Sequence, residues 1–355
     1  MKKAFLVLES GHCYPGQWHG GPARAGEVVF NTSHSGYEEI ATDPSYFNQI
    51  MVMTAPQQGN YQVDDNVWES KAIHIRGFIC LDLQKSEKNS AWMQRLIENQ
   101  VPVVDQIQTR ELVMRLREEG TPWGALVEAN SEAEARDMAK PLIEEAKSLP
   151  RDWPHLVSRS EPEHFVGQKK SGPKVAVLDF GAKENIIREL RSRCSELKVF
   201  PSRTPAEDIR AYDPDGIMLT NGPGDPSDVE VAVDTIKELV GWKPIFGICM
   251  GHQLLALALG AKTSKLKFGH RGSNHPIRDT VLDKIYMTSQ NHGYVVEPES
   301  LPSEVTVTHT NLNDGTVAGL TWNEKKLLSV QFHPESHPGP NDSVKLFDQF
   351  VESLS

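Results

Sequence analysis

A single cysteine, Cys249, lies between an apolar strand-like run and an apolar helix-like run in the stretch IFGICMGHQLLALALGA. Glycine stands two residues away on each side, at Gly247 and Gly251. This is the pattern of a nucleophile elbow, a sharp strand-to-helix turn in which glycine lets neighbouring backbone approach closely. The start of a helix also favours a thiolate over a thiol. The stretch indicates a reactive thiol, although a buried cysteine that only packs is the commoner case.

A cysteine nucleophile needs a base, and the base needs a group that orients it. The stretch LLSVQFHPESHPGP supplies His333 and Glu335 directly after an apolar strand-like run. Residues two apart in an extended segment point the same way, so we expect the carboxylate beside the imidazole. A His-Pro-Glu sequence alone is more often a turn. Its position at a strand end, like that of Cys249, favours a Cys-His-Glu triad.

The elements that must position this triad are short apolar strands that alternate with helices. KVAVLDFG, GIMLTNGPG and KPIFGIC are nearly all apolar, whereas KENIIRELRSR and DVEVAVDTIKELVGW have helical periodicity. Strands buried on both faces with helices between them predict an α/β fold, a doubly wound and mostly parallel sheet over residues 174–355. Ligands bind at the carboxyl ends of such strands, where Cys249 and the loop TNGPGDPSD occur.

The rest of the chain has a different character. Residues 1–150 begin with strand-like runs such as KAFLVLE and NQIMVMTAP and continue with helical patterns, which predicts a separate mixed αβ domain. Residues 151–173 are rich in proline and charge without a sustained period. We expect this segment to be a linker that contains no site residue.

Composition narrows the class of partner. The net charge of −11 argues against nucleic acid as the main ligand, so small molecules or proteins are the expected partners. The four cysteines are scattered without CxxC spacing, which predicts no metal site and no disulfide framework and favours a reducing cytoplasm. No run approaches the roughly 18 apolar residues of a membrane span, so we expect no membrane partner.

PIFGICMGHQLLALALGAKT together with SVQFHPE resembles the class I glutamine amidotransferases, which hydrolyse the side-chain amide of glutamine and pass ammonia to a synthetase. The resemblance implies a thioester on Cys249, with His333 as the acid and base and Glu335 as its orienting group. It assigns the oxyanion to backbone N–H groups of Met250 and Gly224. The glutamine contacts that it further implies are Gly222, Gly224, Gln253, Asn291, Gly293 and Tyr294.

Other interpretations of these residues remain open at this point. Gly222 and Gly224 could form a simple tight turn, and Gln253 could be an exposed helix residue. We expect His252 and His292 to be structural, because the resemblance does not assign the base to either.

GEVVFNTSHSGYEEIATDPSYFNQIM, RGFICLDL, DFGAKENIIREL, TNGPGDP and KFGHRGSNHPI resemble the small subunits of carbamoyl phosphate synthetase over essentially the whole chain. This resemblance adds Ser45 to the expected glutamine site. It implies that the chain holds no cofactor and channels ammonia to a large subunit. That subunit would use ATP, a divalent metal and bicarbonate to make carbamoyl phosphate for arginine and pyrimidine synthesis.

Two rival classes of function are left. One is a non-catalytic subunit that keeps the glutaminase shape and only binds a partner, and the other is a cysteine peptidase that uses the same elbow. The combination of Cys249, His333 and Glu335 disfavours the first, since a binding module needs none of the three.

Overall fold

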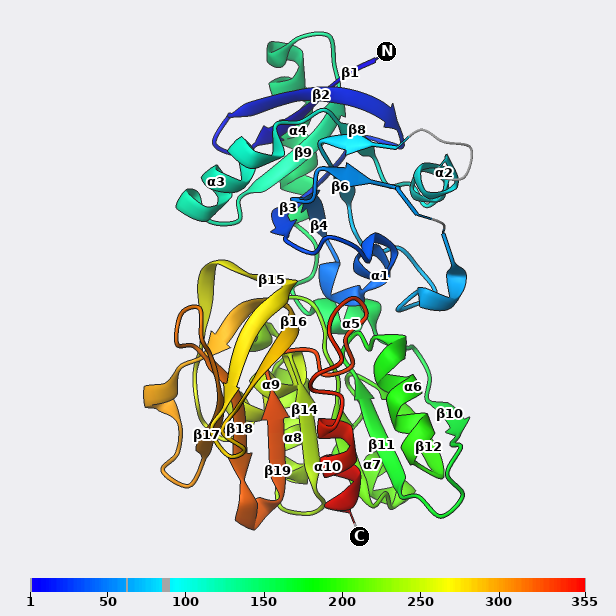
Figure 1. Ribbon diagram of the computed structural model, residues 1–355, viewed down its shortest axis with the longest axis vertical. Coiled ribbons are helices and arrows are strands. Elements are labelled where there is room, and N and C mark those ends of the chain that lie inside the picture. Colours follow the sequence, from blue (N-terminus) through cyan, green and yellow to red (C-terminus); the bar gives the residue numbers. More distant parts are fainter. Residues whose placement is uncertain (1, 62, 85–89, 355) are drawn as a thin grey trace. The chain divides into compact units, whose positions relative to one another are not determined.

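The computed structural model describes residues 2–61, 63–84 and 90–354, and the chain divides into two compact units, residues 1–150 and 151–355 (Figure 1). The segment that the sequence marks as a linker carries a short helix and a strand of its own. This strand pairs with the sheet of the second unit.

The first unit contains a closed barrel whose strands follow the order β1-β2-β8-β6-β4-β3-β9. The barrel strands are β1 (Lys2–Leu8), β2 (Cys13–Gly20), β3 (Arg24–Asn31), β4 (Gln49–Met53), β6 (Gly77–Ile79), β8 (Val103–Asp105) and β9 (Trp123–Glu128). A separate parallel pair consists of β5 (Gln57–Gln58) and β7 (Asp82–Leu83). The helices are α1 (Tyr37–Thr42), α2 (Ser90–Glu98), α3 (Thr109–Glu119) and α4 (Glu132–Lys147), with 3-10 turns η1 (Pro44–Tyr46) and η2 (Asp65–Val67).

Helix α4 shows why this unit mixes helices with its barrel. Ala135, Ala139 and Ile143 recur every four residues and therefore lie on one face, which is buried against Phe5 and Val127 of the barrel. The small alanines let the helix approach the strands closely. The predicted mixed αβ character of this region is confirmed.

The second unit is built on one sheet with the order β10-β12-β11-β13-β14-β19-β18-β17-β15-β16. Its strands are β10 (Glu163–Val166), β11 (Lys174–Asp179), β12 (Glu196–Pro201), β13 (Gly216–Leu219), β14 (Ile245–Ile248), β15 (Thr263–Asp279), β16 (Lys284–Val296), β17 (Thr306–Asn311), β18 (Val317–Trp322) and β19 (Leu327–Val330). Its helices are α5 (Trp153–Val157), α6 (Glu184–Arg193), α7 (Ala206–Tyr212), α8 (Glu230–Leu239), α9 (Met250–Ala258) and α10 (Leu346–Glu352). The 3-10 turns are η3 (Pro226–Asp228), η4 (Pro298–Ser300) and η5 (Asn323–Lys325).

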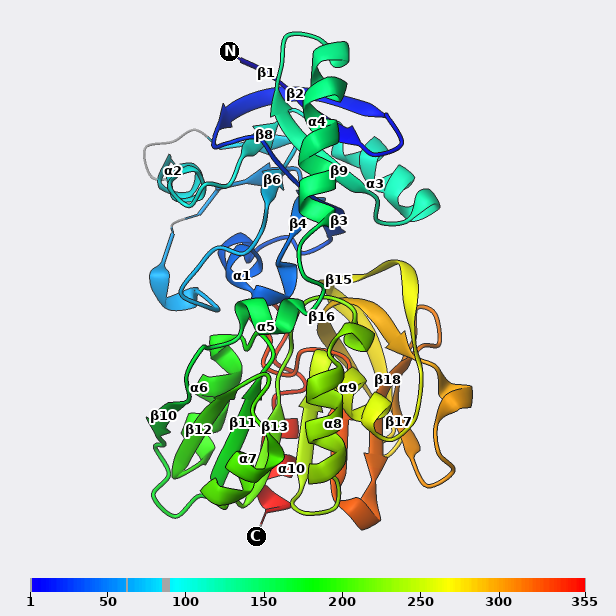
Figure 2. The ribbon, with the colours of Figure 1, turned by 180° about the vertical axis from the view of Figure 1, so that it is seen from behind.

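The central strands β12, β11, β13, β14 and β19 run parallel, and alternate residues face two helix layers. In β11, Val175 and Val177 join the core under α6 and α10, whereas Ala176 and Leu178 join the core under α7, α8 and α9. Helix α10 lies in front of the sheet in Figure 1, and α8 lies in front in Figure 2, which is the opposite view. The doubly wound α/β prediction is confirmed, and antiparallel strands extend the sheet at both edges.

Across the described part of the chain, no helix is both long enough and apolar enough to cross a membrane. All four cysteines are free thiols, and three of them, Cys80, Cys194 and Cys249, are buried.

Candidate active site

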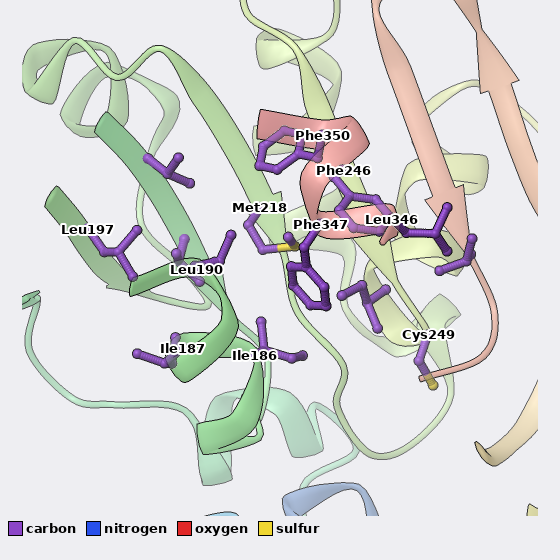
Figure 3. Close-up of a cluster of buried hydrophobic side chains, with 14 of the residues drawn as sticks. Ile186, Ile187, Leu190, Leu197, Met218, Phe246, Cys249, Leu346, Phe347 and Phe350 are labelled. Atoms are coloured by element: carbon purple, nitrogen blue, oxygen red, sulfur yellow. The ribbon is translucent and has the colours of Figure 1, made fainter. Parts of the chain in front are cut away.

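Cys249 occupies a strained turn between β14 and α9. Its backbone has φ of +53° and ψ of −102°, a conformation that costs a non-glycine residue free energy and is found mostly at functional sites. Figure 3 shows the residue at the edge of an apolar cluster that includes Phe246 and Phe347, with its sulfur pointing away from them. Only 2% of Cys249 is exposed. The turn therefore holds the Cys249 thiol at the carboxyl end of a central strand.

The two flanking glycines make this turn possible. A Cβ atom at Gly247 would lie 2.8 Å from the backbone carbon of Gly251, and a Cβ atom at Gly251 would lie 2.3 Å from the carbonyl oxygen of Leu219. Neither position has room for a side chain without moving backbone. The close approach expected from the sequence is confirmed.

His333 and Glu335 form a buried pair just beyond β19. The imidazole Nδ1 lies 2.6 Å from Glu335 Oε1, and the two residues are 2% and 1% exposed. The backbone N–H of His333 donates to the carbonyl oxygen of Ser289 on β16, which fixes the segment against the sheet. The structure thus brings the imidazole and the carboxylate together as predicted, but through a turn over residues 333–336 and not through an extended segment.

Charge keeps this pair ionised despite its burial. Burial by itself would lower the pKa of His333, but the negative charges of Glu335 and Cys249 raise that pKa to about 10. Burial would raise the pKa of Glu335, but Lys183 and His333 lower it to about 2. The arrangement favours an imidazolium at His333 beside the Glu335 carboxylate.

The second nitrogen of His333 is available for the thiol. No oxygen or nitrogen of the described residues hydrogen-bonds to His333 Nε2, and the Cys249 side chain is close enough to raise the pKa of the imidazole. With Nδ1 bound to Glu335, Nε2 is the ring atom that can exchange a proton with sulfur or substrate. This is the geometry required of a general base.

Lys183 is a charged member of the site that sequence reasoning missed. Its Nζ lies 3.2 Å from Glu335 Oε1, and the lysine side chain is only 3% exposed. Lys183 also donates to the carbonyl oxygen of Ser336, which fixes the chain after Glu335. The stretch DFGAKENIIREL contains it, but no spacing links that stretch to the distant His333.

Several of the predicted glutamine contacts converge near the sulfur. The thiol lies 3.5 Å from the carbonyl oxygen of Asn291, to which it can donate. Gln253 is 2% exposed, so it is not the exposed helix residue that the sequence left open. Its Nε2 donates to the carbonyl oxygen of Tyr294 at 2.7 Å and to Gln331 Oε1 at 3.1 Å. The structure gathers Cys249, Gln253, Asn291 and Tyr294.

The glycine loop after β13 lies beside the elbow. A Cβ atom at Gly222 would lie 2.2 Å from the carbonyl oxygen of Phe180, and Gly224 has φ of +94°, so both positions require glycine. The N–H of Gly251 donates to the carbonyl oxygen of Thr220 and ties this loop to α9. Met250 begins α9, where helical N–H groups have no intrahelical acceptor. Oxyanion binding by Met250 and Gly224 stays a prediction.

The segment expected to be a linker contributes a residue to this loop. A Cβ atom at Gly224 would lie only 3.4 Å from Cε3 of Trp153, the first residue of α5. Arg159 holds the segment in place through ion pairs to Asp179 and Glu184, each 2.9 Å long. Trp153 thus lies beside the Gly224 loop, and the arginine pairs hold residues near it against the second unit.

Two predicted site residues have different surroundings. Ser45 lies in the first unit, in η1, where it is 5% exposed and its backbone N–H donates to Asp43 Oδ1 at 2.8 Å. Gly293 lies on β16, and a Cβ there would be in ordinary van der Waals contact with Arg271 Nη2 at 3.6 Å. Their contacts with glutamine stay predictions.

The other histidines named in the sequence have structural contacts. The Nδ1 of His252 lies 2.8 Å from Ser329 Oγ, and burial lowers the pKa of His252 to about 3. His292 lies between Gln290 Oε1 and the carbonyl oxygen of Tyr294, and burial lowers its pKa strongly. A neutral imidazole suits these positions. Within the described ranges, no group of three or more His, Cys, Asp or Glu side chains could hold a metal ion.

Comparisons with known proteins agree along the whole chain. The family model for class I glutamine amidotransferases matches residues 176–353, and that for the CPSase domain of the carbamoyl-phosphate synthase small chain matches residues 6–126. The carbamoyl phosphate synthase small chain of Clostridium perfringens is 46% identical, and the alignment covers 99% of each chain. This chain belongs to the family of carbamoyl phosphate synthase small chains.

A plant small chain is also similar to this chain, and one solved structure aligns with part of it. The chloroplastic carbamoyl phosphate synthase small chain of Arabidopsis thaliana is 42% identical over 99% of this chain and 85% of its own length. The crystal structure of a glutamine amidotransferase from Thermotoga maritima aligns with 46% of this chain and 76% of its own, at 21% identity and a TM-score of 0.37. The small-chain family is thus represented in bacteria and in a plant.

Proposed function

We propose that this small chain hydrolyses glutamine through Cys249, His333 and Glu335 and passes the ammonia to a large synthetase chain. The observation that carries the proposal is the buried 2.6 Å contact between His333 and Glu335 in the same sheet as the strained Cys249 turn. A subunit that only binds a partner has no use for this strained turn and buried charge. Membership of the small-chain family supports a large chain as the ammonia acceptor.

The reaction begins with attack by the Cys249 thiolate on the carboxamide carbon of glutamine, and the oxyanion accepts hydrogen bonds from the N–H groups of Met250 and Gly224. The His333 imidazolium gives its proton to the departing ammonia, which leaves a thioester on Cys249. Neutral His333 then takes a proton from water, and the hydroxide attacks the thioester. Glutamate leaves, and sulfur departs as the thiolate.

The remaining glutamine contacts place the substrate against this sulfur. We assign them to Ser45, Gly222, Gln253 and the strand segment of Asn291, Gly293 and Tyr294. Amide, hydroxyl and backbone groups suit the charged ends of an amino acid. ATP, bicarbonate and the divalent metal belong to the large chain in this proposal, and this chain works without a cofactor. The free cysteines suit a reducing cytoplasm.

The test is glutamate release from glutamine by the purified chain, alone and with the large chain, ATP and bicarbonate. We expect strong stimulation by the large chain and no activity in Cys249→Ser. Activity that depends on Cys249 but ignores the large chain would remove the carbamoyl phosphate assignment. A glutamine-analogue electrophile should label Cys249 selectively; preferential labelling by peptide electrophiles would indicate a peptidase instead.

A further inference from the structure

Gln331 is a buried amide beside the nucleophile, and the reaction above gives it no task. It lies between β19 and His333, is 1% exposed, and places its Nε2 atom 3.8 Å from Cys249 Sγ. The side chain therefore points at the reacting atom.

The direction of this amide follows from its neighbours. The carbonyl oxygen of Tyr294 can only accept, so the Gln253 atom 2.7 Å from it must be the Nε2 donor. The same Nε2 lies 3.1 Å from Gln331, which must therefore present its Oε1 acceptor. That leaves the NH2 group of Gln331 toward sulfur. The carbonyl oxygen of Tyr294 thus fixes the orientation of the Gln253 amide, which in turn fixes the orientation of the Gln331 amide.

The sulfur has a different partner in each protonation state. As a thiol it can donate to the carbonyl oxygen of Asn291, 3.5 Å away. A thiolate has no proton to donate, so that carbonyl ceases to be a partner, whereas the N–H of Gln331 can donate to the charge. Hydrogen bonds to charged groups are about twice as strong as neutral ones. An amide also has no proton to exchange at neutral pH, so it does not compete with His333.

We propose that Gln331 is a further catalytic residue, whose amide N–H stabilises the Cys249 thiolate, and that Gln253 holds that amide in the donating direction. The inference rests on the proposed glutamine hydrolysis. The contact helps twice, when the thiolate attacks the carboxamide and when it leaves the thioester. Gln331 gains or loses no proton in either step.

The first test measures thiolate formation directly, as the rate of Cys249 alkylation by iodoacetamide from pH 5 to pH 10. Cys13, which is partly exposed, is replaced by serine in every variant so that it does not react. We expect Gln331→Leu to slow alkylation about tenfold at pH 7 and to shift the profile about one pH unit upward, since one unit is a tenfold change. Gln331→Glu, which places a negative charge beside sulfur, should shift it further.

His333 interacts with Cys249 and is linked to Glu335 and Lys183 by short contacts, and all three residues are unchanged in these variants. Gln290→Leu is the matched control, because Gln290 is also a buried amide and its side chain hydrogen-bonds to Thr288 and His292. We expect Gln290→Leu to lower the melting temperature about as much as Gln331→Leu and to leave the alkylation profile unchanged. A shift in both variants would mean a general packing effect and would overturn the proposal.

The second test is glutamine-dependent synthesis by the complex of both chains. Gln331→Leu should lower kcat about tenfold with KM changed less than about threefold, and ammonia-dependent synthesis should stay intact. An unchanged kcat and alkylation profile with a raised KM would mean that Gln331 only orients Gln253, which overturns the inference. Alkylation of Cys249 by iodoacetamide does not require glutamine. Absence of glutaminase activity would therefore contradict the proposed function, while the alkylation profile would still test the role of Gln331.

Discussion

Two imidazole–carboxylate pairs in the second unit have nearly the same geometry and opposite electrostatics. His333 Nδ1 lies 2.6 Å from Glu335, and His270 Nε2 lies 2.8 Å from Asp314. Burial acts to lower the pKa of both histidines. Glu335 and Cys249 outweigh it and raise the pKa of His333, whereas burial wins at His270 and lowers its pKa.

The difference lies in what surrounds each pair. Glu335 is 1% exposed and adds its charge to that of Cys249, so two negative groups act on His333. The Asp314 side chain is 34% exposed, and Arg271 opposes its effect on His270. A short contact between imidazole and carboxylate is therefore not enough to make a catalytic base, because the sum of nearby charges decides its protonation.

The largest effect expected from this comparison is in the histidines themselves. His333→Asn should lower glutamine-dependent synthesis more than about 10,000-fold, because it removes both the acid and the base, and should leave ammonia-dependent synthesis intact. His270→Asn should keep glutamine use within about threefold. Parallel assays with glutamine and with ammonium chloride measure both. Loss of ammonia use in His333→Asn would point to a structural role.

Substitution of the two carboxylates should likewise lower glutamine hydrolysis much more at Glu335 than at Asp314. Glu335→Gln should lower glutamine hydrolysis about 1,000-fold, because the neutral amide no longer stabilises the His333 imidazolium. Asp314→Asn should change it less than about threefold. Steady-state glutamate release by the complex compares the two variants. Equal losses would show that the two pairs are not functionally distinct.

Lys183 further distinguishes the two pairs, because its positive charge lies beside the Glu335 carboxylate. Lys183→Met should destabilise the chain by about 3 kcal/mol, since it removes one of the two positive groups that compensate the buried Glu335 carboxylate, and glutamine hydrolysis should fall with it. Denaturant unfolding measures this loss. The double variant Lys183→Met, Glu335→Gln should recover part of the stability; if it recovers none, the ion pair is not the cause.

The smallest effect is on stability in acid. The pKa of Glu335 is lowered from 4.5 to about 2 in the folded chain, so its contribution is present above pH 4.5 and is lost as the pH falls toward about 2. In that window the free energy of unfolding should fall, relative to Glu335→Gln, by at most about 1.4 kcal/mol per pH unit. Asp314→Asn should show a shallower difference, because Asp314 is half-exposed. Unfolding curves at several pH values test this, and parallel curves for the parent and Glu335→Gln would contradict it.

Local pattern predicted the second unit well and the site in part. Apolar strands with helices between them were enough for the doubly wound sheet, and glycine spacing was enough for the elbow at Cys249. The i and i+2 positions of His333 and Glu335 predicted their contact. Gln331 also lies in the stretch SVQFHPE, but the chain bends at Gln331 and Phe332, so strand alternation does not identify it.

The sequence by itself determined the family and the fold class and predicted the nucleophile with its base, because each is encoded in short stretches whose residues are neighbours along the chain. Only the tertiary structure decided that Lys183 lies against Glu335, that Trp153 lies against Gly224, and that Gln253 is buried. Local periodicity carries no information about which strand ends meet. Folding of the sheet brings them together, and the sum of their charges then sets the protonation of His333.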